Sequence, residues 1–438
     1  MGARCASKAT AGDTGLVCLW STSRRREGRA TISSATSTER RCSGADRLAP
    51  SPTPLAFRSL SPTLSPVPLA LAPSELVEIR DTLVRRIREG LATHGAEIKA
   101  LPAYLGPATP TTEGRAIVLD TGGTNMRAAI VELLEGRLRI LAGPVEGRVP
   151  GVTHRVSRVE FFGAQAELIS SLSPETNLPV GYCFSYPSLA VPSRDARLIR
   201  WTKGIDVPDV EGALVGEGLL DALAKNGVRA RSIAVLNDTV AALLAGSLAL
   251  GSSDVLALIA GTGSNLACFV SSPLIPKLDR PFEGEMAINF ETGNFHPPHL
   301  LPLDDAVAAS LPDPTAQRFE KAVAGYYLPH VFLQLTGRRV ESSAELVSLA
   351  NSADPLAEPA RSVLARSADL IAAALAAVAT LRDRHQLEII AEGSLFFGDP
   401  KFRPRVEETL ARLSTHRFMI HRLDHANLAG SAAAALTR

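Results

Sequence analysis

Residues 116–131, AIVLDTGGTNMRAAIV, decide how this chain folds. Two apolar runs, 116–119 and 128–131, flank a turn that contains Gly122 and Gly123. Short apolar runs separated by a Gly-Gly turn are typical of a β-hairpin. We therefore predict two antiparallel strands joined by a glycine turn at this point.

The turn of this hairpin carries residue types that bind phosphate. Glycine lets backbone N–H groups approach an anion closely, and the hydroxyls of Thr121 and Thr124 add donors. Asp120 stands at the end of the first strand, where a carboxylate can hold a metal ion through water. An ordinary hairpin turn explains Gly-Gly alone, but the whole string DTGGTNMR favours a phosphate site.

A second stretch of the same design occurs at 258–265, LIAGTGSN. It again consists of a strand, a glycine turn and the start of another strand, with Gly261, Thr262 and Gly263 in the turn. Two such hairpins in one chain suggest an internal duplication that clamps one nucleotide between two halves. The GTG string is weak by itself and gains weight from the first hairpin.

A third buried run, 233–236, ends on Asn237, Asp238 and Thr239. A carboxylate at the end of a buried strand is rigidly held and can accept a proton from an incoming hydroxyl. An Asx cap at the start of the following helix explains the same residues equally well. From the residues alone, both interpretations of Asp238 stay open.

Around these stretches, short apolar runs alternate with segments of helical periodicity. The predicted strands are 116–119, 128–131, 180–184, 233–236, 255–260, 267–270 and 388–391. The predicted helices are 159–172, 212–225, 240–250, 315–335, 355–384 and 401–413. This alternation predicts an α/β fold with helix-covered sheets, in which ligands bind beyond the carboxyl ends of the strands.

Composition narrows the function classes. The 438 residues suffice for two to three domains, and 45% of them are hydrophobic. The formal net charge of +1 argues against nucleic acid as the main partner. The longest apolar run, 370–381, is shorter than the roughly 18–20 residues of a membrane helix, so we predict a buried helix and a soluble protein without a membrane span. Cys183 and Cys268 are expected to be small core residues.

Residues 1–70 differ in composition from the rest of the chain. They are rich in Arg and Ser and poor in acidic residues, which is the composition of an organelle transit peptide. A disordered tail, or a start codon assigned too far upstream, explains them as well, and we expect a cytoplasmic protein with organelle import as the alternative. Ordered structure is predicted to begin at Ser74, as the N-cap of a helix.

Eight short strings, taken in chain order, resemble motifs of the hexokinase family, which includes the glucokinases and belongs to the actin-like sugar kinases. The resemblance runs from about Arg115 to Arg438. The strings are DTGGTNMR at 120–127, FSYP at 184–187, WTKG at 201–204, NDTV at 237–240, GTG at 261–263, Asn265, INFETG at 288–293 and FEK at 319–321. Each is weak alone, but eight in order are highly specific.

The resemblance implies a role for each matching residue. Asp238 is implied as the catalytic base, and Asp120 as the residue that helps to hold Mg²⁺ through water. The implied sugar-binding residues are Ser185, Thr202, Lys203, Asn237, Asp238, Asn265, Glu291 and Glu320. The implied nucleotide-binding residues are Asp120, Thr121, Gly122, Gly123, Thr124, Asn125, Arg127, Gly261, Thr262, Gly263, Gly393 and Ser394.

The resemblance also implies a fold and an activity. The fold is a duplicated, actin-like (ribonuclease H-like) α/β fold with two lobes around a central cleft. Its expected parts are a helical segment at 71–114 packed on the large lobe, a small lobe at 115–236 and a large lobe at 237–438, whose C-terminal helix can return to the small lobe. The implied activity is ATP- and Mg²⁺-dependent phosphorylation of a hexose at its C6 hydroxyl, at the entry to glycolysis. Glucose is the expected hexose, with mannose and fructose as alternatives.

The segments that resemble the family's adenosine-binding motifs depart from the family pattern. Glu392-Gly393-Ser394 replaces Asp-Gly-Ser, and the later glycine-rich segment keeps one clear glycine, Gly430. The sugar loops differ at Tyr186, Thr292 and Asn294. Three alternatives follow: a glucokinase with a phosphoryl donor other than ATP, a catalytically weak sugar sensor, and an actin-like ATPase without a hexose site.

Overall fold

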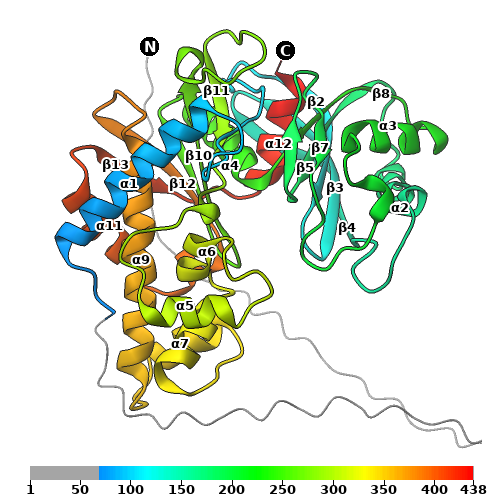
Figure 1. The fold of residues 1–438 in the computed structure, drawn as a ribbon. Coiled ribbons are helices and arrows are strands. Elements are labelled where there is room, and N and C mark those ends of the chain that lie inside the picture. The colour runs from blue at the N-terminus through cyan, green and yellow to red at the C-terminus, as the bar shows by residue number, and fades with distance from the viewer. Residues whose placement is uncertain (1–68, 438) are drawn as a thin grey trace, which may run out of the picture. The chain divides into compact units, whose positions relative to one another are not determined.

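The computed structural model describes residues 69–437, which form two β-sheets with covering helices (Figure 1). The predictions for the N-terminal tail fall almost entirely on residues 1–68 and lie outside the described residues. Ordered structure begins with α1 (Pro73–Ala92), whose N-cap is Ala72 rather than the predicted Ser74. The helix starts earlier because Pro73 suits the first helical position and the carboxylate of Glu75 accepts a hydrogen bond from the backbone N–H of Ala72.

The first sheet has five strands in the order β4-β3-β2-β5-β8. Their bounds are β2 (Gly114–Thr121), β3 (Asn125–Leu134), β4 (Arg137–Arg148), β5 (Leu178–Phe184) and β8 (Ala230–Leu236). Strands β2, β3 and β4 are antiparallel neighbours, whereas β5 and β8 run parallel to β2. The glycine turn predicted at Gly122 and Gly123 joins β2 to β3, as expected.

The second sheet repeats this topology. Its order is β1-β11-β10-β9-β12-β13, and its bounds are β1 (Leu101–Pro102), β9 (Val255–Ala260), β10 (Ser264–Ser271), β11 (Glu285–Asn289), β12 (Gln386–Glu392) and β13 (Arg417–His421). Strands β9, β10 and β11 are antiparallel neighbours, and β12 and β13 run parallel to β9. Apart from the short β1, each sheet has the same order and strand directions, so the predicted duplication is confirmed.

Two helices lie between the sheets, and each covers the sheet of the other half. Helix α4 (Asp238–Leu250) follows β8 of the first sheet but packs on β9, β10 and β12 of the second. Helix α12 (Ala426–Leu436) follows β13 of the second sheet but packs on β2, β5 and β8 of the first. The two helices contact each other closely, and a Cβ on Gly430 would lie 1.9 Å from the carbonyl oxygen of Ala241.

The outer face of the first sheet packs on α2 (Arg158–Ser170) and α3 (Val215–Lys225). Alternation along β2 explains how both faces are filled, because Ile117 and Leu119 join this outer cluster while Ala116 and Val118 face α4 and α12. The hairpin β6 (Ser188–Ala190) and β7 (Ala196–Leu198) and the short helix η1 (Pro208–Val210) lie in the connection between β5 and α3.

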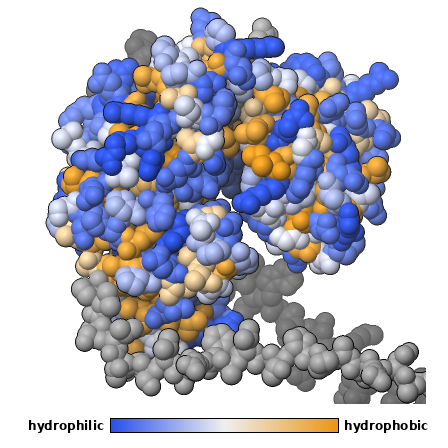
Figure 2. All heavy atoms as spheres, in the orientation of Figure 1, coloured by the Kyte–Doolittle hydropathy of each residue, from blue (hydrophilic) through white to orange (hydrophobic). Residues whose placement is uncertain are grey.

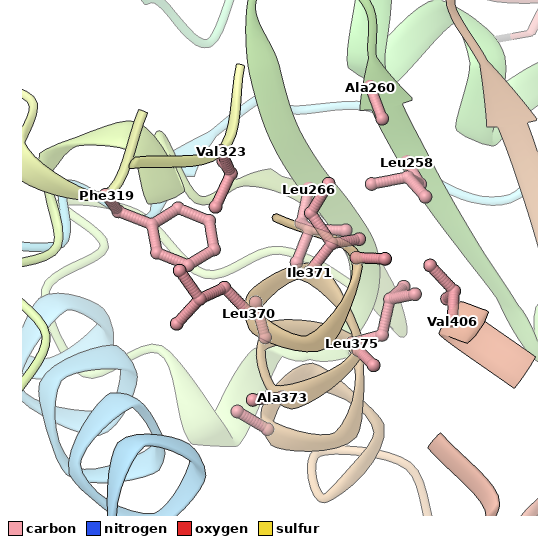
Figure 3. Packing of buried hydrophobic residues seen from close by; sticks show 14 of the residues in the cluster. Leu258, Ala260, Leu266, Phe319, Val323, Leu370, Ile371, Ala373, Leu375 and Val406 are labelled. Atoms are coloured by element: carbon pink, nitrogen blue, oxygen red, sulfur yellow. The ribbon is translucent and has the colours of Figure 1, made fainter. Parts of the chain in front are cut away.

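The largest hydrophobic core lies against the second sheet and centres on α9 (Ala357–Ala379). Leu370, Ile371 and Leu375 of this helix pack with Leu258 and Leu266 (Figure 3). The other helices on this side are α5 (Pro302–Ala309), α6 (Arg318–Val323), α7 (Leu328–Thr336), α8 (Ser343–Ala350), α10 (Ser394–Gly398) and α11 (Phe402–Leu413), with η2 (Ser272–Leu274) and η3 (Thr292–Asn294), while α1 packs on α9 and α11.

Helix α9 confirms the predicted buried helix. Within residues 69–437 it is the one helix long and apolar enough to cross a membrane, and 89% of its most apolar window is buried inside the protein. That burial is typical of a core helix. Elsewhere the exposed hydrophobic residues form scattered groups among hydrophilic ones on the face shown in Figure 2.

The prediction of one helix over 315–335 is wrong. The segment forms α6 and α7, with an interruption at Ala324–Tyr327. The backbone N–H groups of Gly325 and Tyr326 donate to the carbonyls of Gly261 and Thr262, at 2.8 and 3.2 Å, instead of continuing the helix. The interruption therefore holds the second glycine turn in place.

Candidate active site

The register of the first sheet brings three predicted site segments to one edge. Asp120 of β2 pairs with Cys183 of β5, and Cys183 pairs with Leu236 of β8. Because these three strands are parallel, the residues that follow each strand leave the sheet at the same edge. Ser185 and Asp238 therefore emerge beside Asp120.

The Cys183 thiol lies close enough to both aspartates to be affected by their charge. Its pKa is raised well above the ordinary value by burial, and the carboxylates of Asp120 and Asp238 raise it further. Cys183 is completely buried, as expected for a core residue. Its position shows that Asp120 and Asp238 lie within electrostatic reach of one small side chain.

The sequence left open whether Asp238 caps the helix or serves as a free carboxylate, and the structure assigns the cap to Asn237. Asn237 is the N-cap of α4, and its side-chain oxygen accepts a hydrogen bond from the N–H of Val240 at 2.9 Å. Asp238 is the first residue of the helix, where one carboxylate oxygen, Oδ1, accepts from the N–H of Thr239 at 2.8 Å. The cap is therefore supplied by Asn237, and the half-buried carboxylate of Asp238 keeps its other oxygen for a ligand.

A chain of side-chain hydrogen bonds leads away from the start of α4. The amide nitrogen of Asn265 on β10 donates to Thr239 Oγ1 at 3.0 Å and to Asn289 Oδ1 at 2.7 Å. Asn289 on β11 in turn donates to Glu291 Oε1 at 2.7 Å. These polar side chains from α4 and the second sheet are fixed by one another, which is the arrangement a hydroxyl-rich ligand requires.

Two glutamates face Asp238 across this network. Burial raises the pKa of Glu291, with a further increase from the Asp238 carboxylate and a decrease from Lys203. Burial raises the pKa of Glu320 to about 7, against a lowering by the N–H of Ser264, and Glu291 adds to the increase. The carboxyl groups of Asp238, Glu291 and Glu320 therefore influence one another's charge, and Lys203 partly offsets them.

Lys203 connects the loop that carries Ser185 with the first glycine turn. Its ammonium donates to the carbonyl of Ser185 at 2.8 Å and lies 5.3 Å from the ring centre of Tyr186. A Cβ placed on Gly123 would meet the Lys203 side chain at 3.0 Å. Thr202 precedes Lys203 in the same loop, so both residues lie on the side of the site formed by the first sheet.

The first glycine turn presents its backbone while its carboxylate is already paired. Asp120 Oδ2 accepts from Arg127 Nη2 at 2.9 Å and from Asn427 Nδ2 at 3.3 Å. Thr121 is completely buried, so its hydroxyl faces the protein interior, whereas Thr124 and Asn125 are exposed. The turn therefore offers backbone N–H groups and the exposed residues to a ligand.

Asp120 is a suitable residue for Mg²⁺ held through water. Within residues 69–437, no three His, Cys, Asp or Glu side chains gather into a metal cage. Mg²⁺ commonly keeps several waters and binds through one carboxylate and the phosphates of a nucleotide. The bonds from Arg127 and Asn427 both reach Oδ2, so the donor set at Asp120 fits this mode of binding.

The second glycine turn is enclosed by backbone. A Cβ on Gly261 would lie 3.2 Å from the Cα of Gly393, and a Cβ on Gly263 would lie 2.8 Å from Glu320 Oε1. Helix α10 begins at Ser394, directly after Gly393. The structure thus brings Gly261, Thr262 and Gly263 together with Gly393 and Ser394, while Thr262 is exposed.

The donor-side segments of the two halves also lie close to each other. Burial raises the pKa of Glu392, and the cations Arg422 and Arg127 lower it. Arg127 belongs to the first hairpin and Glu392 ends β12 of the second sheet. The bond from Asn427 to Asp120 joins the two halves at the same end of the sheets, beside the two glycine turns.

Three site residues were not predicted from the sequence. Asn289 lies inside the INFETG string, but a strand residue gives no sign of its hydrogen-bond partners. Asn427 lies in the segment with few glycines, and its contact with Asp120 spans most of the chain. Tyr186 was noted only as a departure, although its hydroxyl donates to the carbonyl of Gly122.

Comparison with known proteins identifies the family. Two models described as Hexokinase match residues 67–248 and, in two overlapping segments, 255–360 and 345–437. Hexokinase-1 of Schizosaccharomyces pombe is 32% identical over 280 residues, which are 60% of this chain and 57% of that protein. Hexokinase-9 of Oryza sativa subsp. japonica is 33% identical over 275 residues, 59% of this chain and 55% of that protein. The match thus spans little more than half of these relatives.

Solved structures agree on the fold. The hexokinase from Schistosoma mansoni complexed with glucose has a TM-score of 0.74 and 26% identity, covering 84% of this chain and 96% of that one. A ROK hexokinase from Thermus thermophilus, at a TM-score of 0.52 and 20% identity, covers 74% of this chain and 98% of that one. These matches confirm the predicted two-lobed, actin-like sugar kinase fold. Because the two Hexokinase models together cover nearly all of the described chain, this protein belongs to the hexokinase family.

Proposed function

We propose that this protein transfers the terminal phosphoryl group of ATP to the C6 hydroxyl of a hexose, with glucose as the preferred acceptor. One observation carries the proposal. The register of β2, β5 and β8 places Asp238 beside Asp120 and the first glycine turn, and the bond from Asn265 to Thr239 connects the start of α4 to the strand that follows the second turn, where Glu320 accepts from the N–H of Ser264. A carboxylate placed between a polar pocket and two phosphate-binding turns suits transfer between a hydroxyl and a nucleotide.

The polar network supplies the acceptor side of this mechanism. Asn265, Glu291 and Glu320 provide donors and acceptors that would hold the hydroxyls of a sugar ring in one orientation. An unpaired polar group in such a site costs about 1–3 kcal/mol, which gives the pocket its power to reject a sugar with a misplaced hydroxyl. Asp238 would accept the proton of the reacting hydroxyl as the new bond forms.

The two turns supply the donor side. Their N–H groups, with Arg127 and the exposed Thr262, would hold the phosphates and oppose the negative charge that develops on them. Mg²⁺, held through water by Asp120, would neutralise charge on the phosphates when it is bound. Lys203, from the sugar loop, lies beside Gly123 and adds a positive charge between the two substrates.

The proposal names glucose as the specific acceptor and ATP as the specific donor. For the acceptor, support comes from the order of the eight sequence motifs and from the glucose complex of the related Schistosoma mansoni hexokinase. For the donor, support comes from the paired glycine turns. The replacement of donor-side glycines by residues such as Asn427, which contacts Asp120, favours a test of other donors as well. Cytoplasmic location and a role at the entry to glycolysis stay predictions.

A coupled ADP-release assay tests both parts. Glucose, mannose, fructose and glucosamine are compared as acceptors, with 6-deoxyglucose as the matched control that keeps the ring but lacks the reacting hydroxyl. We expect the highest kcat/KM with glucose and no sugar-dependent ADP release with 6-deoxyglucose. ATP is then replaced by GTP and by polyphosphate, with sugar phosphate measured directly. Absence of phosphorylation with every acceptor and donor would contradict the proposal.

A further inference from the structure

The hydroxyl of Tyr186 makes a long-range bond to the first glycine turn. It donates to the carbonyl oxygen of Gly122, and the tyrosine is only 3% exposed. The ring packs against Phe184 and Trp201, with centroid distances of 4.8 and 5.0 Å. Because the ring is held on two sides, the hydroxyl has one fixed position relative to the turn.

This bond fixes a peptide group that faces the donor. In a trans peptide the C=O and the following N–H point in opposite directions, so a fixed Gly122 carbonyl also fixes the Gly123 N–H. The N–H of Gly122 donates to Asn125 within the turn at 3.0 Å, whereas that of Gly123 has no hydrogen-bond partner among residues 69–437. The N–H of Gly123 is therefore directed away from Tyr186 and remains available to an anion.

The peptide between Gly122 and Gly123 needs a bond that fixes its orientation, because both of its residues are glycines. A Gly-Gly peptide rotates more freely than any other, and a flipped peptide would present its carbonyl oxygen, rather than its N–H, to a phosphate. A buried hydroxyl that bonds the carbonyl disfavours the flipped orientation, since flipping leaves the hydroxyl unpaired.

The same tyrosine is continuous with the sugar loop. Ser185 precedes it, its N–H donates to the carbonyl of Thr121 at 3.2 Å, and its carbonyl accepts from Lys203 at 2.8 Å. A sugar that orders Ser185 and Lys203 would thereby hold Tyr186, and through Tyr186 the peptide between Gly122 and Gly123.

We propose that Tyr186 is a positioning residue that holds the Gly122–Gly123 peptide with its N–H toward the phosphates of the donor and makes donor binding depend on the sugar loop. The inference rests on the proposed function, because it assigns the first turn to the donor. The hexokinase motif that FSYP resembles has phenylalanine at this place, so the hydroxyl is an addition to a ring position that is already suited to the fold.

The test compares Tyr186→Phe with the wild type. The variant keeps the ring and removes the hydroxyl, and we expect kcat/KM for ATP at saturating glucose to fall about tenfold. We expect kcat/KM for glucose at saturating ATP to change less than threefold. Tyr104→Phe is the matched control, because Tyr104 lies in the segment after β1 and packs on the hydrophobic core around α9 rather than on either glycine turn.

Binding measurements separate this inference from the proposed function. Calorimetric titration with a non-hydrolysable ATP analogue, with and without glucose, should show about tenfold weaker binding to Tyr186→Phe in glucose and a smaller difference without it. Trp201 directly precedes Thr202 and Lys203, so a change in its fluorescence on addition of glucose is a second measure of sugar binding. Equal analogue affinity of variant and wild type in glucose would overturn the positioning role. A wild type that binds neither glucose nor the analogue would overturn the proposed function, and this inference with it.

Discussion

The two glycine turns have the same place in the duplicated topology but are held in different ways. The first receives backbone bonds at Thr121 and Thr124, but its glycine peptide is held by a side chain, with Tyr186 bonded to the Gly122 carbonyl, and Asn427 is bonded to the neighbouring Asp120. The second is held by backbone, because the N–H groups of Gly325 and Tyr326 donate to its carbonyls. A turn held by side chains can be tuned by single substitutions, whereas a turn enclosed by backbone tolerates almost none.

We expect the largest loss of activity from a substitution outside both turns, at Asp238. Asp238→Asn keeps the shape of the side chain and removes its ability to take a proton, so kcat should fall by about 10²- to 10⁴-fold. Glucose and ATP-analogue affinities should stay within a few-fold of wild type, since both turns remain intact. Asp221→Asn, on the exposed side of α3, is the control and should leave kcat unchanged. Near-normal kcat in Asp238→Asn would show that another group accepts the proton.

The second turn should not tolerate a side chain at the neighbouring Gly393. Gly393 has φ of +120°, and a Cβ there would lie 2.3 Å from the carbonyl oxygen of Ala260. We expect Gly393→Ala to destabilise the protein by about 3 kcal/mol or more, measured by denaturant unfolding.

The matched substitution in the first turn is Gly123→Ala. Its Cβ would meet only the movable side chain of Lys203, at 3.0 Å, and Gly123 needs no positive φ. We expect its unfolding free energy to change by less than about 1 kcal/mol. Equal losses of stability in the two variants would contradict the distinction between a turn held by side chains and one enclosed by backbone.

The pKa of Glu320, raised to about 7, predicts a pH dependence of sugar binding. Sugar hydroxyls donate to the carboxylate, so binding favours the charged form, and affinity should increase as pH rises through 7. Between pH 6 and pH 8 the glucose Kd should fall about tenfold, as expected for one proton lost. Glu320→Gln should flatten most of this change, and an unchanged slope would assign the titration to another group.

The same carboxyl makes the stability of the fold depend on pH. Its pKa is higher in the folded chain than in the unfolded one, so the folded state binds the extra proton and stability should decrease as pH rises from about 4.5 to 7. Chemical unfolding at several pH values, without sugar, measures this contribution, which Glu320→Gln should remove.

The smallest expected effect is on KM for ATP when the bond between Asn427 and Asp120, beside the first turn, is removed. Asn427→Ala removes a 3.3 Å bond to Asp120 but leaves the ion pair with Arg127, so KM for ATP should rise only two- to threefold. Arg127→Met removes the stronger partner and should raise KM for ATP further. A larger effect of Asn427→Ala than of Arg127→Met would mean that the amide contacts the donor itself.

Much of the central fold was predictable because its strands are continuous apolar runs. The runs at 116–119, 180–184, 233–236 and 255–260 all lie inside observed strands. Strand β4 was missed because its residues mostly alternate between partly buried and exposed, and its one apolar run, 140–142, is only three residues long and is followed by Gly143 and Pro144. Helix α12 is absent from the helices predicted by periodicity and was expected only from the family resemblance, as the C-terminal helix that can return to the small lobe.

At the site, individual residues were predictable from the sequence, but the hydrogen bonds between distant residues were not. Local strings identified Asp238 and both glycine turns, since each lies at the end of a strand. The bonds from Tyr186 to Gly122 and from Asn427 to Asp120 join residues far apart in the chain, and no local pattern encodes them. The break between α6 and α7 has the same cause, because its hydrogen bonds go to the second turn rather than along the helix.

The exchange of α4 and α12 between the halves has a consequence for the order of synthesis. The inner face of the first sheet packs on α12, and a Cβ on Gly181 of β5 would lie 2.0 Å from the carbonyl oxygen of Ser431. That face therefore lacks its main cover, α12, until residues 426–436 have been made, although all of its strands were made long before. The nascent first sheet has an apolar surface in need of protection, and a chaperone is expected to engage the chain during that interval.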